Sequence, residues 1–466
     1  MQTDDSRFDA LAIAAQAGAD YRRRIATAET TPVDSYAEVL ARFKVPLPET
    51  GGASTDIVRE LIDKATSGIR AMTAPRFFGW VIGSSHPTGV AADWLTSAWG
   101  QNCGNVIAAP AACAVEAVVA GWVLDLLHLP RECSVGVVSG ATVANTVCLA
   151  AARGEVLRRA GWDVEADGLF DAPKITVMIG ADAHATLFSG LRYLGLGAKR
   201  VVEIATDALG RMLPDALEAA LKTHGGPLIV IAQAGQINTG VSDPFAKIVP
   251  LVRAAGGWLH VDGAFGLWAA ASPKHRHLVA GVEQADSWGT DGHKWLQTPY
   301  DGSFAIVRDE AAHRRAMNIT ASYLPTAAES ERDPTAYVME LSRRARGFAM
   351  WAMIKQLGRE GVARMVEQHI SIARAMAADM KQIEGVELIA EPELNQFMIR
   401  FGDSDDLTRA TVEQTQRDAV AFIGGSEWRG RWVMRFSVSS LATTPEDGRI
   451  TVQAVRAAWE KVQARG

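Results

Sequence analysis

A short apolar run that ends in a carboxylate decides the fold: Trp258-Leu-His-Val-Asp262, followed by Gly-Ala-Phe265-Gly. A second peptide lies further along the chain, Ser287-Trp-Gly-Thr-Asp-Gly-His293-Lys294-Trp295. Strands that are buried on both faces of a parallel sheet are apolar along their whole length, as the first run is. Binding groups in such sheets gather at the carboxyl ends of the strands. The two peptides therefore predict one site, with Asp262 at the end of a buried strand and Lys294 beside it.

A carboxylate and a lysine placed in this way suit one cofactor, pyridoxal 5'-phosphate. The lysine amine binds the cofactor aldehyde as a Schiff base, and the carboxylate keeps the pyridine nitrogen protonated. The protonated ring accepts electrons, which makes it feasible to break a bond at the α-carbon of an amino acid. We therefore predict that Lys294 carries the cofactor and that Asp262 is the partner of its ring nitrogen.

The middle of the chain alternates between apolar runs and helical patterns. Two of the helical patterns cover residues 214–224 and 244–255. Such alternation is typical of an α/β fold with a mostly parallel sheet covered on both faces. The predicted strands are 133–138, 174–179, 200–204, 227–232, 257–261 and 303–307.

Three regions are expected along the chain. Residues 1–75 form an N-terminal helical segment, 76–347 a large cofactor-binding domain, and 348–466 a small α+β domain with strands at 396–401 and 431–438. The stretch 318–342 is poor in periodic apolar residues and contains Pro325 and Asp333-Pro334, which favours a mobile loop within the large domain.

Bulk composition excludes several classes of protein. The 466 residues carry a formal net charge of −6 without a long basic run, so neither nucleic acid nor an anionic membrane surface is expected as a partner. The start, Met1-Gln-Thr-Asp-Asp5, lacks the apolar core of a secretory signal. The four cysteines show neither CxxC nor metal-site spacing. We expect reduced thiols in a cytoplasmic protein and no bound metal.

A turn of small residues offers a place for the phosphate. Ser139-Gly140-Ala141-Thr142 follows a predicted strand and opens an Ala-rich helix. Small residues allow the backbone to approach a phosphate, and a helix N-terminus supplies free N–H groups and a favourable dipole. Small residues at such turns also serve packing alone, so this interpretation depends on Asp262 and Lys294.

The chain resembles the group II pyridoxal-phosphate-dependent amino-acid decarboxylases, the family of aromatic-L-amino-acid and glutamate decarboxylases. The resemblance implies fold type I, a homodimer and an amino-acid substrate. The chain looks like a member of a divergent bacterial-type branch of this family. It extends over most of the chain. Besides the peptides quoted above, it rests on Pro75-Arg-Phe-Phe78-Gly-Trp80, Ala109-Pro110-Ala-Ala112, Asp182-Ala-His184, Ala234-Gly235, Ser342-Arg343-Arg344 and Phe436-Ser-Val-Ser439.

Resemblance also implies roles for single residues. Lys294 matches the Schiff-base lysine and Asp262 the partner of the pyridine nitrogen. Ala264 matches the small residue beneath the ring, and His184 the histidine that stacks on its other face and orients the substrate carboxylate. A hydrogen-bonded core histidine remains an alternative for His184. The positions that match residues around the phosphate are Ala141, Thr142 and His293.

The family's catalytic loop carries a tyrosine that protonates the α-carbon after carbon dioxide has left. Tyr337 is the candidate for this catalytic role, with Tyr323 as the second choice. The spacing from Tyr337 to Arg343-Arg344 is shorter than in the animal enzymes. A tyrosine at the loop surface or in a dimer contact is the alternative interpretation of Tyr337.

Two positions depart from the family pattern. Many members carry a threonine that contacts the phenolic oxygen of the cofactor, where this chain has Ile237, and either Gln236 or Asn238 is a possible substitute. Asp291 stands where animal members have asparagine, and a carboxylate near a phosphate is unfavourable unless it faces away.

The resulting hypothesis is a homodimer that decarboxylates an L-amino acid to the amine and carbon dioxide. Trp80 and the Phe77-Phe78 pair suggest an apolar pocket and an aromatic substrate. One alternative is an oxidative deaminase that decarboxylates and yields an aldehyde, and another is a carbon–carbon lyase or aminotransferase on the same fold. An inactive homologue that acts as a binding protein is the alternative from another class.

Overall fold

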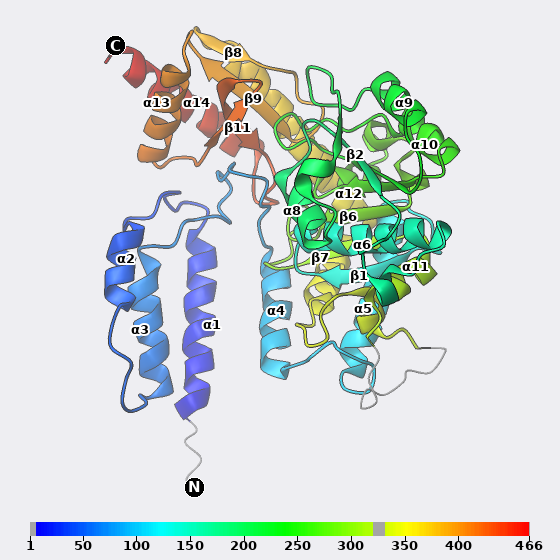
Figure 1. Cartoon of the computed structure of the whole chain (residues 1–466). Helices are drawn as coiled ribbons and strands as arrows, with labels where there is room; N and C mark the ends of the chain where they lie inside the picture. The colour runs from blue at the N-terminus through cyan, green and yellow to red at the C-terminus, as the bar shows by residue number, and fades with distance from the viewer. Residues whose placement is uncertain (1–5, 320–330, 466) are drawn as a thin grey trace.

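The computed structural model describes residues 6–319 and 331–465. Its helices and strands form a large mixed sheet with helices on both faces, a smaller antiparallel sheet, and an N-terminal group of helices (Figure 1). The α-helices are α1 (Ser6–Arg24), α2 (Tyr36–Phe43), α3 (Ser54–Thr66), α4 (Pro87–Trp99), α5 (Pro110–Leu126), α6 (Ala141–Arg159), α7 (Val164–Asp167), α8 (Ala185–Tyr193), α9 (Pro214–Lys222), α10 (Phe245–Ala254), α11 (Glu310–Met317), α12 (Gly347–Met380), α13 (Asp405–Arg417) and α14 (Pro445–Gln463). Short 3-10 turns cover η1 (Ala198–Arg200), η2 (Gly266–Ala271), η3 (Arg276–Val279), η4 (Val282–Gln284) and η5 (Pro334–Tyr337).

The large sheet has seven strands in the order β1-β7-β6-β5-β4-β2-β3. Neighbouring strands run parallel except for β7, which is antiparallel to both β6 and β1. The fold class expected from the sequence, α/β with a mostly parallel sheet, is therefore confirmed. The strands are β1 (Ser134–Val138), β2 (Thr176–Gly180), β3 (Val202–Ile204), β4 (Leu228–Gln233), β5 (Trp258–Asp262), β6 (Ser287–Asp291) and β7 (Ser303–Val307).

Alternation along β4 shows how the sheet is buried on both faces. Val230 and Ala232 pack into one hydrophobic cluster, with residues of α5 and α12, while Ile229 and Ile231 pack into a second cluster, with residues of α6. Successive side chains of a strand point to opposite faces, so an unbroken apolar run satisfies both layers of helices.

The strand β6 was not predicted, because its sequence Ser-Trp-Gly-Thr-Asp is not an apolar run. All five residues are nevertheless buried. Trp288 donates its indole N–H to the carbonyl of Val282, and a side chain at Gly289 would collide with the Asn145 amide of α6. Hydrogen bonds to β5 and β7 on its two sides give β6 its extended form.

The smaller sheet has four antiparallel strands in the order β10-β11-β9-β8. The predicted strand at 396–401 has the bounds of β9, and the one at 431–438 corresponds to β11. The strands β8 and β10 are short, and their sequences gave no signal. The bounds are β8 (Val386–Leu388), β9 (Gln396–Phe401), β10 (Gly424–Trp428) and β11 (Arg431–Ser437).

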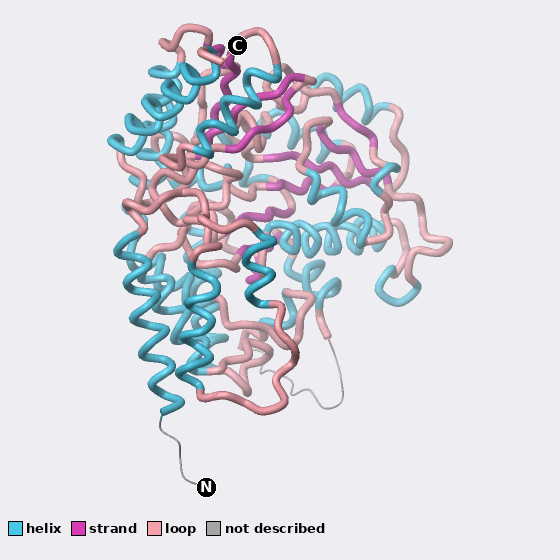
Figure 2. The backbone as a smooth tube through the Cα atoms, turned by 90° about the vertical axis from the view of Figure 1, so that its left-hand side faces the viewer, coloured by secondary structure: helices cyan, strands magenta, loops and turns pink. Residues whose placement is uncertain are grey.

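The first three helices stand apart from the large sheet. In Figure 1, α1, α2 and α3 lie side by side beyond α4, and Figure 2 shows α1 extending away from the strands toward the N-terminus. Both α2 and α3 are described in full, and neither contains a buried residue. The division of the chain at residues 75/76 and 347/348 remains our proposal.

The described residues include all four cysteines, and each of these is buried and unpaired. Across residues 6–319 and 331–465, none of the helices combines the length and the apolar composition that crossing a membrane requires.

Candidate functional site

A pocket opens at the carboxyl ends of the parallel strands β4, β5 and β6. It brings together the start of α6, the start of α8 and the segments that follow these strands. Its lining residues are Gly140, Ala141, Thr142, His184, Thr186, Gln233, Gly235, Ile237, Asp262, Ala264, Phe265, Asp291, His293 and Lys294. All of the predicted cofactor-binding residues thus line one pocket, as the parallel arrangement of the strands requires.

Asp262 is the last residue of β5 and pairs with Gln233 of β4 on one side and Gly289 of β6 on the other. Its carboxylate accepts a hydrogen bond of 3.2 Å from the backbone N–H of Ala264. Only 6% of Asp262 is exposed, so its charge is available to the pocket rather than to solvent. This is the position that a partner of a buried pyridine nitrogen needs.

The amine of Lys294 enters the same pocket from the turn after β6. Its Nζ lies 3.0 Å from the Oδ2 atom of Asp291, and 17% of its side chain is exposed. The ring of Phe265 lies 5.9 Å from Nζ. The amine is therefore held by a carboxylate at the pocket wall while part of the side chain remains accessible.

The N-terminus of α6 provides the phosphate position. Gly140 is its N-cap, and no side chain caps this end among the described residues. The backbone N–H groups of Val143 and Ala144 return to the carbonyl of Gly140, and Gly140, Ala141 and Thr142 face the pocket. An uncapped helix start directed into a pocket suits a phosphate group.

His184 immediately precedes α8 and lines the pocket. Its Nδ1 atom lies 2.7 Å from the Thr186 hydroxyl and accepts from the Thr186 backbone N–H. Burial lowers the pKa of His184 below its ordinary range, although the nearby Asp262 carboxylate acts in the opposite direction. Thr186 thereby holds the His184 ring where it lines the pocket. No pattern in the sequence indicated this role of Thr186.

His293 is held more tightly than His184. Its Nδ1 accepts from the Gly302 backbone N–H at 3.3 Å, and its ring lies 4.3 Å from the ring of Tyr300. Burial lowers the pKa of His293, and only 7% of the residue is exposed. The structure therefore places this residue at the pocket wall in a fixed orientation.

The sequence indicated that a carboxylate at position 291 would be unfavourable near the phosphate unless it faced away. In the structure the Asp291 side chain faces the site. Its Oδ2 atom contacts Lys294 and lies 3.6 Å from His293 Nε2. The paired lysine explains why a carboxylate is tolerated here: a buried charge requires a partner of opposite sign. The only indication of this contact in the sequence was the aspartate at position 291, where the family pattern has an asparagine.

Arg435 of β11 contacts the backbone of the pocket residue Ile237, and it was missed because it lies far away in sequence. Its guanidinium donates to the carbonyl of Ile237 at 3.3 Å and to Asn238 Oδ1 at 3.2 Å. Among the described residues no carboxylate forms an ion pair with it. Burial lowers the pKa of Arg435 to about 10, and its charge contributes to the lowered pKa of His184.

The two proposed substitutes for the missing threonine use their side-chain oxygens within the loop after β4. Gln236 accepts from the backbone N–H groups of Asn238 and Thr239, at 2.6 and 3.0 Å. Asn238 accepts from Arg435 and Ser426. Ile237 itself lines the pocket. Replacement of the threonine by one of these amides remains a prediction.

Tyr337 lies away from the pocket within this chain. It belongs to η5, is 3% exposed, and donates its hydroxyl to Glu310. Burial, followed by the bond to Glu310, raises the pKa of Tyr337. The described part of the predicted mobile loop therefore includes a buried turn. The catalytic role of Tyr337 remains a prediction without support from this geometry, and Tyr323 lies outside the described residues.

The aromatic residues expected near the substrate have other neighbours. Phe77 stacks on Phe422 with a centroid distance of 4.8 Å, and Phe78 is fully buried against Phe436. Neither ring lines the pocket within this chain, and a place for the pair at the substrate remains a prediction. Trp80 remains 49% exposed and lies 5.1 Å from the ring of Phe422.

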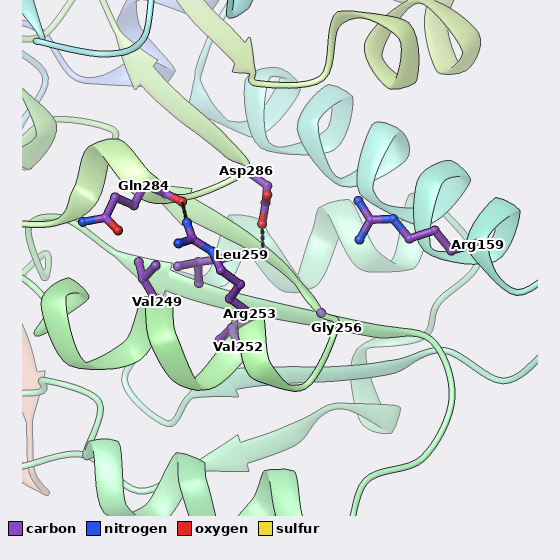
Figure 3. Close-up of a pocket in the computed structure, with 9 residues that line it drawn as sticks. Arg159, Val249, Val252, Arg253, Gly256, Leu259, Gln284 and Asp286 are labelled. Atoms are coloured by element: carbon purple, nitrogen blue, oxygen red, sulfur yellow. Dashed lines mark hydrogen bonds between the residues drawn. The ribbon is translucent and has the colours of Figure 1, made fainter.

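A second pocket lies at the opposite, amino ends of β5 and β6 (Figure 3). Asp286 immediately precedes β6 and accepts from the backbone N–H of Leu259, while Arg253 donates to the carbonyl of Gln284. This pocket contains no lysine or histidine. It provides a half-buried aspartate, Asp286, at the other end of the strand that carries Asp291.

The fold and the pocket define a fold type I pyridoxal-phosphate enzyme. Residues 38–401 match the family model described as the pyridoxal-dependent decarboxylase conserved domain. The chain belongs to this family of amino-acid decarboxylases, as the resemblance implied. Its cofactor is pyridoxal phosphate, and the uncapped start of α6, the buried Asp262 carboxylate and the accessible Lys294 amine all fit that molecule.

Similar proteins agree with this assignment. Tryptophan decarboxylase 1 of Oryza sativa is 26% identical over 89% of this chain and 85% of its own. The aromatic-L-amino-acid decarboxylase of Sus scrofa is 27% identical over 92% of this chain and 90% of its own. The crystal structure of Oryza sativa TDC with PLP and tryptamine superposes with a TM-score of 0.91 and 21% identity over 99% of each chain, which establishes the similarity of fold.

Below the pocket, His260 joins the three elements that carry it. Its Nδ1 lies 3.0 Å from the Ser287 hydroxyl of β6, and its Nε2 lies 3.0 Å from Asn145 Oδ1 of α6. His260 is fully buried, and desolvation lowers its pKa to about 3. A neutral ring satisfies both hydrogen bonds, while a protonated ring would be a buried charge without a carboxylate partner.

This burial makes stability depend on pH. As the pH falls below the ordinary pKa of 6.5, the unfolded chain takes up a proton that folded His260 refuses, so stability is lost toward acid. His260→Asn is expected to lower the slope of unfolding free energy against pH by about 1.4 kcal/mol per pH unit between pH 6 and 4.5. Urea unfolding at several pH values measures this slope. The exposed His277→Asn is the control, and equal slopes for wild type and His260→Asn would contradict the assignment.

Proposed function

We propose that the protein decarboxylates an aromatic L-amino acid to the corresponding amine and carbon dioxide. The observation that carries this proposal is the convergence of Asp262, Lys294 and the start of α6 in one pocket of a chain from the decarboxylase family. The substrate class is supported by the similar tryptophan and aromatic-L-amino-acid decarboxylases. Two apolar residues of the pocket, Ile237 and Phe265, suit an aromatic side chain.

The residues of this chain divide the work of the reaction. When bound, pyridoxal phosphate supplies an aldehyde that captures an amine and a ring that accepts the electrons of the breaking bond. Lys294 would hold that aldehyde, and the carboxylate of Asp262 would keep the ring nitrogen protonated. The N–H groups at the start of α6 bind the phosphate. His184 lies over the pocket and orients the substrate.

Arg435 is proposed to bind the carboxylate that leaves as carbon dioxide. Its guanidinium lies beside His184 and has only neutral oxygen acceptors among the described residues. An Arg side chain recognises a carboxylate through paired N–H donors. Together with His184 and Ala264, Arg435 would fix the direction of the substrate carboxylate relative to the bound cofactor, and this would favour loss of carbon dioxide over transamination.

A first test measures products by mass spectrometry after incubation of cofactor-loaded enzyme with the common L-amino acids and dihydroxyphenylalanine. We expect amine and carbon dioxide from aromatic substrates, and no turnover by Lys294→Ala, because this variant lacks the amine that holds the cofactor. The exposed Lys274→Ala is the control. Normal turnover by Lys294→Ala would overturn the assignment. Aldehyde with peroxide or ammonia would establish the oxidative alternative, and amine from acidic substrates alone would refute the aromatic class.

A second test separates carboxylate recognition from other binding. Arg435→Met is expected to raise KM for the amino acid by about 10- to 100-fold, because a charged hydrogen bond contributes about 1.5–3 kcal/mol. Inhibition by the product amine, which lacks the carboxylate, is expected to stay near the wild-type level. Arg431→Met on the same strand is the control, since Arg431 is exposed. Equal weakening of amino acid and amine would argue against this role.

The enzyme is further proposed to be a cytoplasmic homodimer. Neither α2 nor α3 contains a buried residue, yet both present large apolar side chains, including Leu40, Phe43, Ile57 and Leu61. Exposed apolar surface of this extent is typical of an interface. A cytoplasmic location is supported by the four unpaired cysteines, and disulfides in protein isolated from cells would contradict it.

Sedimentation equilibrium at micromolar concentration tests the dimer. The wild type is expected to have the mass of two chains, and Leu40→Glu combined with Phe43→Glu is expected to yield monomers, because two charges would be buried in the interface. Phe170→Glu is the control, since Phe170 is 91% exposed and lies outside α1–α4. A monomeric wild type would refute the proposal.

A further inference from the structure

The carboxylate nearest to the Lys294 amine belongs to Asp291. The distance from Oδ2 to Nζ is 3.0 Å, and this is the only ion pair of Lys294 among the described residues. Asp262 forms no ion pair with Lys294 among the described residues, and its Oδ1 atom accepts from the backbone N–H of Ala264. Of the two aspartates in the pocket, Asp262 is therefore available to the ring and Asp291 to the lysine.

The backbone fixes Asp291 rigidly. As the last residue of β6 it pairs with Ser303 of β7, donates its N–H to the carbonyl of Ala264, and accepts the indole N–H of Trp268 at 3.0 Å. Only 1% of the residue is exposed. A carboxylate on such a support holds a flexible lysine in one direction, whereas Lys294 by itself has four rotatable side-chain bonds.

The other oxygen of Asp291 is unusual. Oδ1 is buried and has no hydrogen-bond partner among the described residues. A buried charged oxygen without a donor is costly, so the charge of Asp291 depends on the contact of its Oδ2 atom with Lys294. Geometry thus places a carboxylate oxygen of Asp291 directly against the N–H groups of Lys294.

We propose that Asp291 is a positioning residue and proton acceptor for Lys294 during capture of the cofactor. An ammonium has no free electron pair, so the lysine must lose a proton before it attacks an aldehyde. In this step an N–H bond of Lys294 breaks and an O–H bond forms at Asp291, while the electron pair stays on Nζ. The inference rests on the proposed assignment of Lys294.

Other titratable groups surround this pair. His293 belongs to the same turn, Tyr300 to the segment after it, Asp262 to β5, and His184 to the start of α8. Arg435 is the nearby cation from β11. These groups also titrate, so the pH dependence of the Asp291 variants must be compared with that of a control variant that keeps all of them.

The experiment measures cofactor capture by the full-length protein after its cofactor has been removed. Pyridoxal phosphate is added, the change in its absorption is followed from pH 6 to 9, and borohydride reduction with peptide mass spectrometry locates the attached lysine. Asp291→Asn is expected to slow capture about 10²-fold near neutral pH, as loss of an acid–base group does. Its rate is expected to rise with pH, because hydroxide replaces the missing acceptor. Asp291→Glu, which keeps a carboxylate, is expected to capture faster than Asp291→Asn.

Asp286→Asn is the matched control, because it changes a half-buried aspartate at the other end of β6 (Figure 3). It is expected to capture cofactor at the wild-type rate. The proposal would be overturned if Asp291→Asn captured the cofactor at the wild-type rate at every pH. It would also be overturned if Asp291→Asn and Asp291→Glu captured the cofactor equally slowly and their rates depended on pH in the same way. Attachment at a lysine other than Lys294 would instead refute the assignment of Lys294, so the two failures are distinguishable.

Discussion

The parallel pairing of β4, β5 and β6 is the constraint on which the site depends. These strands are buried on both faces, so the polar groups that they carry are brought to their ends. Gln233 pairs with Asp262, and Asp262 pairs with Gly289. One edge of the sheet thereby collects groups from segments far apart in the chain. The start of α6 reaches the same edge because β1, although separated from β6 by the antiparallel β7, runs in the same direction as the other strands.

Charge balance within this edge explains the division of labour between the two aspartates. Each carboxylate is almost fully buried, and a buried charge is tolerated only with hydrogen bonds or a partner of opposite sign. Asp291 is paired with Lys294, while Asp262 accepts one backbone hydrogen bond and otherwise faces the cavity. The pocket therefore keeps one negative charge for a protonated ring nitrogen, and the second serves the lysine.

A buried polar framework below the pocket keeps these groups in register. Trp258 donates to the Ser287 hydroxyl, which bonds to His260, and His260 in turn bonds to Asn145. This chain links β5, β6 and α6, the elements that carry Asp262, Asp291 and the phosphate position. Satisfied networks of this kind specify one arrangement of the surrounding elements. Rigidity at the floor of the pocket contrasts with the exposed helices α2 and α3, whose apolar side chains remain uncovered in the single chain.

The sequence by itself determined the α/β class, because unbroken apolar runs are local signals, and its motifs determined the family and the cofactor. It also predicted the pocket residues Ala141, Thr142, His184, Asp262, Ala264, His293 and Lys294. It did not reveal β6, which is extended only because β5 and β7 bind it on both sides. Tertiary structure alone decided that Arg435 of β11 contacts Ile237, and that Phe77 and Phe78 pack against Phe422 and Phe436. It also placed Tyr337 in a buried turn. These outcomes depend on packing between segments distant in the chain, and no local pattern of residues encodes such contacts.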